Sequence, residues 1–428
     1  MLTNPGDDRE PMYDLIRRLF PICRSITGDG VRETLRIVGE LIPLTVHEVA
    51  TGTKVFDWTV PREWNIRDAY IKDAKGNRIV DFRANNLHVV SYSSPVHETM
   101  ALRDLQRHLH SVPEQPEIVP YRTSYYDESW GFCLSHRQRE ALPDGDYEVF
   151  VDSTLSDGSL TYGECLLPGA SDDEVLIYTH TCHPSLANDN LSGIAVCTFL
   201  ARLLESQERR YSYRFVFAPG TIGSLVWLSR NLNRLSRIRH GLVAVLLGDP
   251  GRLRYKRSRN GNAEIDRAAQ HALKHSTAEY DVDAFSPSGY DERQFGSPGI
   301  NLPVGRLSRS ANGGYAEYHT SADNLALIQP ESLAGSLSAC ADIVEILEND
   351  GRYVNTSPFG EPQLGRRGLY RKTGGGLLPD RETAMLWTLN LSDGAHSLLD
   401  IAERAGLDFR VVRRTADELR DAGLLIPA

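Results

Sequence analysis

Between residues 145 and 350, short apolar segments alternate with longer amphipathic segments, and this alternation constrains the fold more than any other feature of the chain. The predicted strands are 147–153, 174–180, 213–219 and 241–249, and the predicted helices are 191–207, 221–235, 263–276 and 331–349. Short strands separated by helices about twice as long favour an α/β fold with a mostly parallel sheet covered on both faces. Such sheets bind ligands at the carboxyl ends of their strands.

The flanking segments have a different character and divide the chain into three predicted domains. Residues 11–45 carry apolar side chains at helical spacing and predict two helices, whereas the segments that follow are short, β-branched and broken by turn residues. We interpret 1–48 together with 139–352 as one α/β domain, and 49–138 as a small, aromatic-rich β domain inserted into it. Residues 365–428 predict three helices and a wing, which is typical of a winged helix.

The composition is that of an ordinary globular protein and argues against several classes of partner. Of the 428 residues, 41% are hydrophobic and 24% are charged, and the formal net charge is −10. This balance disfavours nucleic acid and anionic lipid as partners. The six cysteines form no CxxC pair, the first residues are polar, and no apolar stretch could span a bilayer. We therefore expect a cytoplasmic protein without a membrane partner.

The stretch HTCHPSLANDNLSG, residues 180–193, follows an apolar strand and concentrates side chains that can bind a metal ion. His183 and Asp189 share one loop, because Pro184 prevents a helix from running through it. Imidazole nitrogen and carboxylate oxygen are both ligands that zinc accepts. We expect His180 to support these ligands without binding the metal itself, and Cys182 to be a buried, unreactive thiol.

Three further groups of polar side chains follow other predicted elements. Asp249 ends an apolar strand, Glu317 and His319 lie in EYHTSADN, and Asp291 and Glu292 lie in YDERQF. Each group also has an ordinary explanation, because aspartate favours turns and charged runs usually face solvent. Since strand ends converge at one edge of a sheet, the groups together predict one metal site.

Several stretches resemble the co-catalytic zinc aminopeptidase superfamily, which includes bacterial leucyl aminopeptidases and glutaminyl cyclases. The resemblance is greater to a bacterial group that combines an aminopeptidase-like core, an inserted β domain and a C-terminal winged helix. The similar stretches are LFPICRSITGDGVRETL, VFDWTVPREWNIRDAYI, CHPSLANDNLSG, PGTIGSLVWL, YKRSRNGNAEID, YDERQF and EYHTSADN. This resemblance spans nearly the whole chain and implies four metal ligands: His183, Asp189, Asp249 and His319.

One departure from the superfamily pattern bears directly on activity. Superfamily peptidases carry Pro-Glu-Glu where this chain has Pro219, Gly220 and Thr221, so a metal ligand and the general base are both missing. The resemblance then implies one zinc ion, with a second left open. Glu317 or Glu292 would replace the base. Asp291 keeps its place in a loop that reads Asp-His-x-x-Phe in the superfamily.

These features predict a metallo-hydrolase, specifically a zinc-dependent amide hydrolase of the aminopeptidase or deacylase type, acting on a small peptide-like or aminoacyl substrate. The missing glutamates keep two alternatives open. One is a cyclase or acyl transferase on the same scaffold in a biosynthetic pathway. The other is a catalytically inactive ligand-binding or regulatory protein that uses its winged helix as an interaction module. Whether the chain forms a homo-oligomer is also left open.

Overall fold

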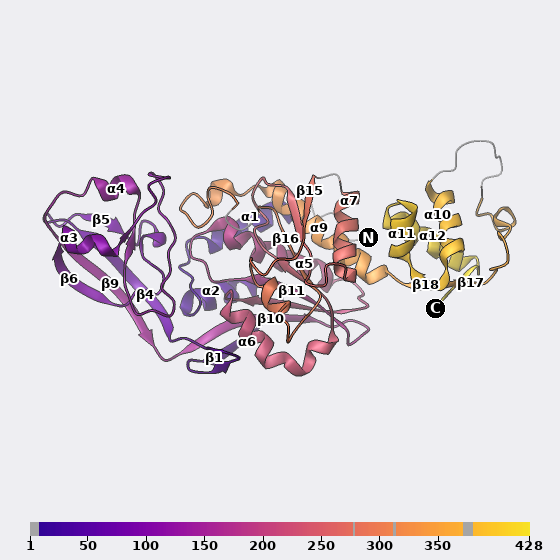
Figure 1. The fold of residues 1–428 in the computed structure, drawn as a ribbon, viewed down its shortest axis with the longest axis horizontal. Coiled ribbons are helices and arrows are strands. Elements are labelled where there is room, and N and C mark those ends of the chain that lie inside the picture. Colours follow the sequence, from indigo (N-terminus) through magenta and orange to yellow (C-terminus); the bar gives the residue numbers. More distant parts are fainter. Residues whose placement is uncertain (1–7, 277–278, 311–313, 371–379) are drawn as a thin grey trace. The chain divides into compact units, whose positions relative to one another are not determined.

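The computed structural model describes residues 8–276, 279–310, 314–370 and 380–428. The chain forms two compact units (Figure 1). Unit 1 comprises residues 1–263 and 279–338, and unit 2 comprises residues 264–278 and 339–428. Among the described residues, no helix has both the length and the apolar character that crossing a membrane requires.

An eight-stranded mixed sheet forms the centre of unit 1. Its strands, in spatial order, are β1 (Thr45–Ala50), β10 (Ser159–Leu167), β12 (Ser212–Ala218), β11 (Glu174–His180), β13 (Ile238–Ala244), β16 (Val304–Ser308), β14 (Leu253–Lys256) and β15 (Tyr280–Asp283). The central pairs β12–β11, β11–β13 and β13–β16 are parallel, whereas β1–β10, β10–β12 and β14–β16 are antiparallel. The predicted α/β class is confirmed, with antiparallel pairs toward both sides of the parallel centre.

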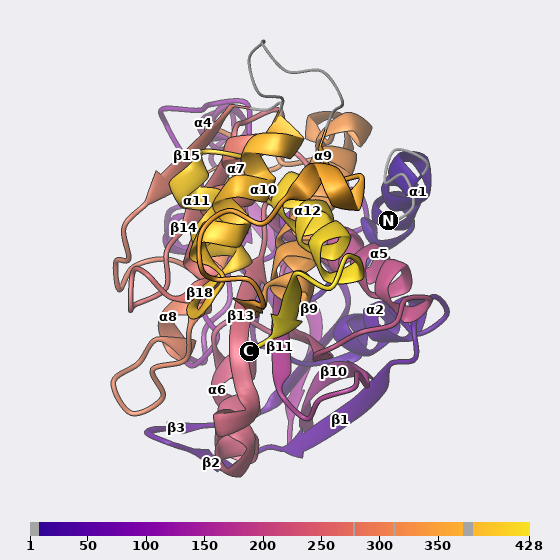
Figure 2. The same ribbon diagram turned by 90° about the vertical axis from the view of Figure 1, so that its right-hand side faces the viewer.

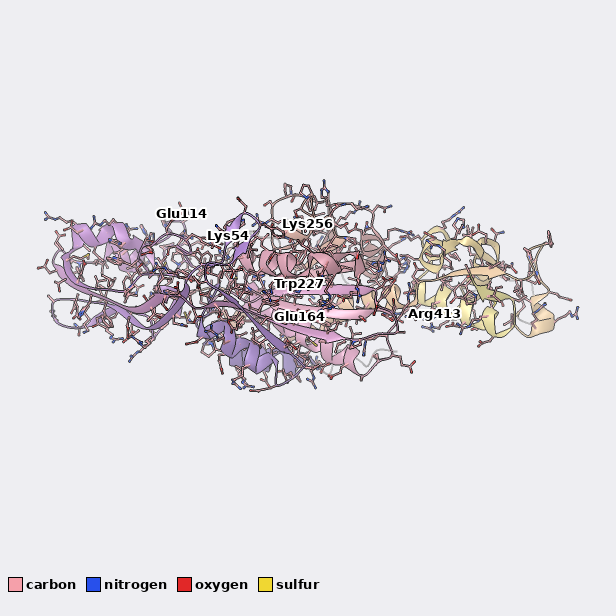
Figure 3. The ribbon with its side chains drawn as sticks, turned by 90° about the horizontal axis from the view of Figure 1, so that it is seen from below. Lys54, Glu114, Glu164, Trp227, Lys256 and Arg413 are labelled. Carbon is pink, nitrogen blue, oxygen red and sulfur yellow. The ribbon has the colours of Figure 1, made fainter. Side chains whose placement is uncertain are left out.

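Helices cover both faces of this sheet (Figure 2). Every residue of β11 is buried, as expected for a strand covered on two sides. Unit 1 contains α1 (Arg9–Leu19), α2 (Asp29–Val38), α5 (Gly193–Glu205), α6 (Ile222–Asn231), α8 (Glu292–Phe295), the first part of α9 (Pro330–Asn349) and the short turns η4 (Ala187–Ser192), η5 (Leu232–Arg237) and η6 (Leu325–Leu327). Trp227 of α6 is buried and meets Phe295 of α8 at 6.2 Å between ring centroids (Figure 3).

A second, four-stranded antiparallel sheet forms the β module. It is ordered β5 (Arg78–Asp81), β4 (Glu63–Lys72), β9 (Asp146–Ser156) and β6 (Val96–Ala101). Around it lie the hairpin β2 (Lys54–Val55) and β3 (Trp58–Thr59), the pair β7 (Leu109–His110) and β8 (Phe132–Cys133), the helices α3 (Leu102–Leu105) and α4 (His136–Glu140), and the turns η2 (Asn86–His88) and η3 (Gln106–His108). The strand predicted at 147–153 is β9. It belongs to this sheet and not to the central one, which corrects that expectation.

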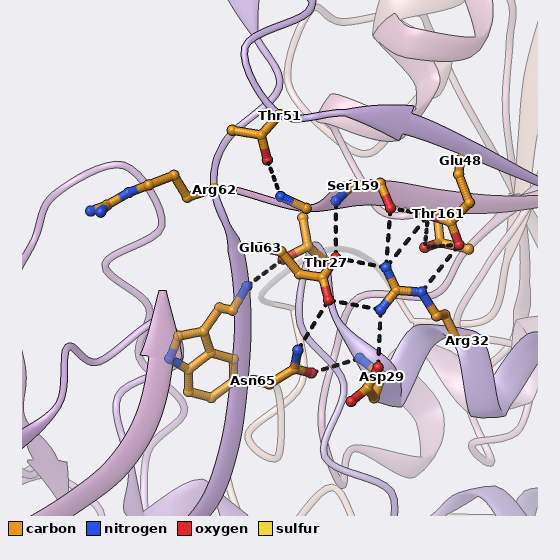
Figure 4. A network of polar contacts seen from close by, with 12 residues as sticks. Thr27, Asp29, Arg32, Glu48, Thr51, Arg62, Glu63, Asn65, Ser159 and Thr161 are labelled. Atoms are coloured by element: carbon orange, nitrogen blue, oxygen red, sulfur yellow. Dashed lines mark hydrogen bonds and ion pairs between the residues drawn. The ribbon is translucent and has the colours of Figure 1, made fainter. Parts of the chain in front are cut away.

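Arg32 of α2 joins the two sheets of unit 1 through a network of polar contacts (Figure 4). Its guanidinium donates to both carboxylate oxygens of Glu63 in β4, at 2.8 and 2.6 Å, and to Glu48 of β1 at 3.1 Å. The hydrogen bonds from Arg32 are the main cause that lowers the pKa of Glu63 to about 2. The β module is therefore tied to the central domain by charge-assisted bonds as well as by its covalent connections.

Unit 2 contains the C-terminal winged helix. Its elements are α7 (Glu264–His275), the last part of α9, β17 (Arg352–Asn355), η7 (Leu364–Arg367), α10 (Asp380–Leu391), β18 (Asp393–Ser397), α11 (Leu398–Ala405), α12 (Phe409–Asp421) and β19 (Leu425–Pro427). The three strands pair in the order β18–β17–β19. Residues 371–379 of the predicted module lie outside the described residues.

Candidate metal centre

The loop after β11 brings three metal-capable side chains together in the interior of unit 1. His180 is the last residue of β11, and Asp189 lies in the turn that precedes α5. His180 Nε2 is 2.8 Å from Asp189 Oδ1, and His183 Nδ1 is 3.8 Å from the same oxygen. One ligand atom from each of the three residues lies within 4.8 Å of the other two. This spacing suits a single cation bound by nitrogen and oxygen ligands.

His319 reaches the same cluster from more than a hundred residues downstream. Its Nε2 lies 3.1 Å from Asp189 Oδ2, and its ring centroid is 5.1 Å from that of His183. The backbone of His319 has a φ of 54°, which is uncommon for a non-glycine residue and typical of functional sites. The predicted residues His183, Asp189 and His319 therefore meet, and His180 joins them, although the sequence indicated only a supporting role for it.

The protonation states and the unpaired atoms of the cluster both suit a metal ion. Burial lowers the pKa of His183 to about 3, so its imidazole is neutral at pH 7. Burial opposes ionisation of Asp189, but the surrounding imidazoles lower its pKa well below the usual range. Within the described part of the chain, His180 Nδ1, Asp189 Oδ2 and His319 Nε2 are buried and form no hydrogen bond, although the last two lie 3.1 Å apart. Because buried polar atoms are rarely left unpaired, these residues fit a bound cation.

Two buried charged residues hold the metal-binding loop in place. Asp323 accepts hydrogen bonds from the backbone N–H groups of Asn188 at 2.6 Å and Asp189 at 3.0 Å. Arg24 donates from Nε to the carbonyl oxygen of His183 at 2.8 Å. The sequence analysis assigned no role to either residue. The available signal was that Arg24 lies in LFPICRSITGDGVRETL and Asp323 in EYHTSADN, two of the stretches that carry the family resemblance.

Asp249 lies beside the loop and bonds to protein groups. Its Oδ2 accepts from Asn188 Nδ2 at 2.8 Å, and its Oδ1 accepts from Ser310 Oγ and the Gly251 N–H, both at 2.7 Å. Among the described residues, Asp249 does not join the group of close ligand atoms formed by His180, His183 and Asp189. In this geometry Asp249 orients the side chain of Asn188, whereas the sequence analysis predicted that it binds the metal ion.

The three carboxylates expected near the reacting groups have different surroundings. Ser224 donates to Asp291 Oδ1 at 2.6 Å, and burial raises the pKa of Asp291 to about 6. Glu292 is buried in an ion pair with Lys256 at 2.9 Å and lies 3.4 Å from Arg306. Glu317 is half-buried, and among the described residues its carboxylate has no hydrogen bond or ion pair.

Gly220, which stands where superfamily peptidases carry a glutamate, leaves little room for a side chain. A Cβ atom placed there would be 3.0 Å from Asp291 Oδ2 and 3.3 Å from the Cβ of His180. The Asp291 carboxylate therefore borders Gly220, the position where the resemblance implies a glutamate.

Aromatic rings enclose the cluster, and the sequence did not identify Tyr290 and Tyr318 as neighbours of the ligands. Tyr121, a residue of the β module, lies 5.3 Å from His183 and 5.2 Å from His319 between ring centroids. Tyr290 stacks on His180 at 5.0 Å, and Tyr318 stacks on His319 at 4.0 Å. These rings restrict the access of water and strengthen the electrostatic interactions within the site.

The arginines of α12 in unit 2 are engaged by acidic neighbours. Arg410 donates to Glu345 at 2.8 Å and also contacts Asp342, while Arg413 pairs with Asp417 at 3.0 Å. Arg410 and Arg413 are therefore ion-paired within the unit.

The fold and the site together define a mixed α/β protein with an aminopeptidase-like domain and a winged helix. A family profile described as a domain of unknown function (DUF4910) matches residues 13–350, and one described as a winged helix-turn-helix matches residues 351–427. The chain belongs to the DUF4910 family.

Relatives and solved structures agree with this assignment. A Clostridium acetobutylicum protein, named as a polysaccharide biosynthesis protein with aminopeptidase-like domain, is 53% identical over 425 residues, which cover 99% of this chain and 98% of the relative. A crystal structure of a peptidase-like protein from the same organism has a TM-score of 0.96 at 51% identity and covers 100% of this chain and 98% of the other. The zinc aminopeptidase BSAP of Bacillus subtilis has a TM-score of 0.61 at 13% identity over 81% of this chain and 96% of the other, which shows a shared fold.

Proposed function

We propose that this protein is a zinc-dependent amide hydrolase that acts on a small substrate. The observation that carries the proposal is the convergence of three imidazoles on the buried carboxylate of Asp189, where three buried polar atoms form no hydrogen bond among the described residues. A cluster of this composition has the ligand types of a catalytic zinc site. The zinc aminopeptidase fold supports the same interpretation without deciding the reaction.

The side chains divide into metal ligands and a proton carrier. His180, His183, Asp189 and His319 would hold the ion, whose Lewis acidity polarises an amide carbonyl and acidifies water when it is bound. We assign the general base to Asp291, because its carboxylate borders the position of the missing glutamate and its raised pKa suits proton transfer near neutrality.

In the proposed reaction, Asp291 accepts a proton from the attacking water as the oxygen of that water bonds to the amide carbon. It then returns the proton to the nitrogen as the carbon–nitrogen bond breaks. The products are a carboxylic acid and an amine. Glu292 is the weaker candidate for this role, because Lys256 and Arg306 engage its carboxylate, and Glu317 is the remaining one.

The test combines metal analysis with hydrolysis of a panel of aminoacyl amides and N-acylated amines. We expect about one zinc per chain in protein purified without added metal, and turnover that a chelator abolishes and zinc restores. His183→Ala should lose both metal and turnover. His97→Ala is the matched control, because the His97 side chain is 65% exposed. A metal-loaded protein that hydrolyses no amide in the panel would refute the proposal.

A second candidate function is amide formation without water, as in a cyclase or acyl transferase. It is favoured by one observation, the absence of both glutamates at Gly220 and Thr221. Mass spectrometry of the products separates the two reactions, because hydrolysis adds the mass of water to the amide whereas cyclisation onto a side-chain amide releases ammonia.

A further inference from the structure

The hairpin β2–β3 exposes large aromatic side chains on the surface of unit 1. Trp58 is 47% exposed and Tyr126, from a loop of the β module, is 49% exposed, and their ring centroids are 5.5 Å apart at an angle of 55°. Phe56, in the turn of the same hairpin, is 50% exposed. We call Trp58 and Tyr126 the aromatic pair. Large exposed rings that lie together indicate a binding surface.

The backbone next to the aromatic pair is in a conformation that bulky residues rarely adopt. Phe56 has a φ of 53°, and Tyr125, the neighbour of Tyr126, has a φ of 28°. Both values lie in the positive region, where a bulky side chain is strained. At Phe56 strain and exposed apolar surface both disfavour the folded state, so a role in packing does not explain that residue. The Tyr125 ring is partly buried and contacts Tyr92 at 5.7 Å between ring centroids.

Two tyrosines connect the aromatic pair to the metal centre. Tyr125 directly precedes Tyr126 in the chain, and its hydroxyl lies 2.8 Å from the hydroxyl of Tyr121. The Tyr121 ring in turn contacts His183 and His319. A ligand that rests on the aromatic pair is therefore next to the segment that lines the metal centre.

The size and polarity of the surface fit a sugar ring. Three half-exposed rings offer roughly 300 Å², whereas a stable protein interface needs about 800 Å² on each partner. The exposed Asp57 lies in the hairpin turn between Phe56 and Trp58, and a carboxylate there opposes insertion into lipid. A pyranose has an apolar face for the aromatic rings and hydroxyl groups for neighbouring polar side chains such as Asp57 and Lys54.

We propose that the aromatic pair binds a pyranose ring and that the metal centre acts on an amide carried by a sugar, that is, an N-acylated amino sugar. The second half of this inference rests on the proposed amide hydrolase function. The reaction adds water across the N-acyl bond, so the acyl group leaves as a carboxylic acid and the sugar retains a free amine. The aromatic pair then determines which substrates reach the metal, and it takes no part in bond breaking.

The first experiment measures binding of tri-N-acetylchitotriose by calorimetry, using the full chain with its metal removed by chelation. The double variant Trp58→Ala, Tyr126→Ala should bind roughly tenfold more weakly than the wild type. Trp58→Tyr should retain most of the affinity, because it keeps an aromatic ring. The control is Phe359→Ala, since Phe359 is a fully exposed aromatic residue in unit 2. Absence of binding to the wild type, or equal binding by the double variant, overturns the inference.

The second experiment separates this inference from the proposed function by measuring release of acetate from the same trisaccharide by the zinc-loaded protein. The double variant should raise KM about tenfold with little change in kcat, and it should leave turnover of small aminoacyl amides unaltered. Binding of the trisaccharide through the aromatic pair without acetate release would support the sugar-binding role of the pair and would count against the proposed amide hydrolase function. Binding of phosphatidylglycerol vesicles that is lost in the double variant would show that the aromatic pair binds lipid, and it would overturn the proposed sugar-binding role.

Discussion

Replacing Arg24 by methionine tests whether a buried arginine holds the metal-binding loop in place. The Arg24 side chain is 1% exposed, and its guanidinium donates to the carbonyl oxygens of Leu19 and His183 at 2.8 Å and of Pro184 at 3.2 Å. Burial lowers its pKa to about 10, which still leaves it charged at pH 7. Methionine has a similar length but donates no hydrogen bond, so the His183 carbonyl would stay buried and unpaired, whereas the carbonyls of Leu19 and Pro184 keep backbone N–H donors.

The magnitude follows from the number of bonds that are lost. The buried His183 carbonyl left without a donor costs about 1–3 kcal/mol, and each of the two other lost hydrogen bonds contributes about 0.5–1.5 kcal/mol, so we expect Arg24→Met to lower the free energy of unfolding by about 2–6 kcal/mol. Two of the three carbonyls belong to the loop that carries His183. Loss of a group that orients a metal ligand typically weakens metal binding roughly 10–100-fold.

The assay pairs urea unfolding of the metal-free protein with competition for zinc against a chromogenic chelator. Arg18→Met is the matched control, because Arg18 pairs with Glu40 at the surface, where solvent screening makes ion pairs contribute little to stability. The stability and zinc affinity of Arg24→Lys should fall between those of the wild type and Arg24→Met, because lysine keeps the positive charge but lacks the planar guanidinium that donates to several carbonyl groups at once. An unchanged zinc affinity in a folded Arg24→Met protein would refute the reasoning.

Three further substitutions test the site and its connection to the β module. His180→Ala should lower zinc affinity roughly 10–100-fold by equilibrium competition; a full metal content at limiting zinc would show that His180 is not a ligand. A base must be deprotonated to act, so kcat/KM should fall in acid with a midpoint near the Asp291 pKa of about 6. Asp291→Asn should abolish turnover without removing zinc. Normal turnover in this variant would show that Asp291 is not the general base. Arg32→Met should lower the urea midpoint of unfolding at pH 7. In the folded protein its partner Glu63 has a pKa of about 2, below the ordinary 4.5. The stabilisation by the Arg32–Glu63 pair is therefore present above pH 4.5 and disappears as the pH falls toward 2. Wild type and Arg32→Met should therefore converge in acid, and a constant difference between them would contradict this role for Glu63.

The elements of the central domain could be predicted because buried strands have a distinct sequence pattern. The predicted strands 174–180 and 213–219 correspond to β11 and β12, in which every residue is buried. The partner of a strand is harder to predict. Residues 147–153 were expected in the same sheet, but β9 alternates between buried and more exposed positions and pairs with β4 and β6. That alternation was the available signal for a sheet with one covered face.

The ligands were predictable in part, because sequence shows which side chains can bind a metal but not where their atoms point. His183, Asp189 and His319 meet as expected. His180 was assigned a supporting role, since strand alternation alone does not show that the last residue of β11 turns its imidazole onto Asp189. Asp249 was expected to bind the metal because it ends an apolar stretch. The strand β13 in fact ends at Ala244, and the carboxylate of Asp249 bonds to Asn188 and Ser310.

The crowding at Gly220 opposes a glutamate at this position. A Cβ atom at this position would already lie 3.0 Å from the Asp291 carboxylate and 3.3 Å from His180, so a glutamate would displace both residues. Ligand atoms of His180 and His183 lie within 4.8 Å of an Asp189 oxygen, and His319 Nε2 lies 3.1 Å from the other oxygen of this carboxylate. Three imidazoles around one carboxylate favour one zinc ion over two, which supports the one-metal form of the proposed function.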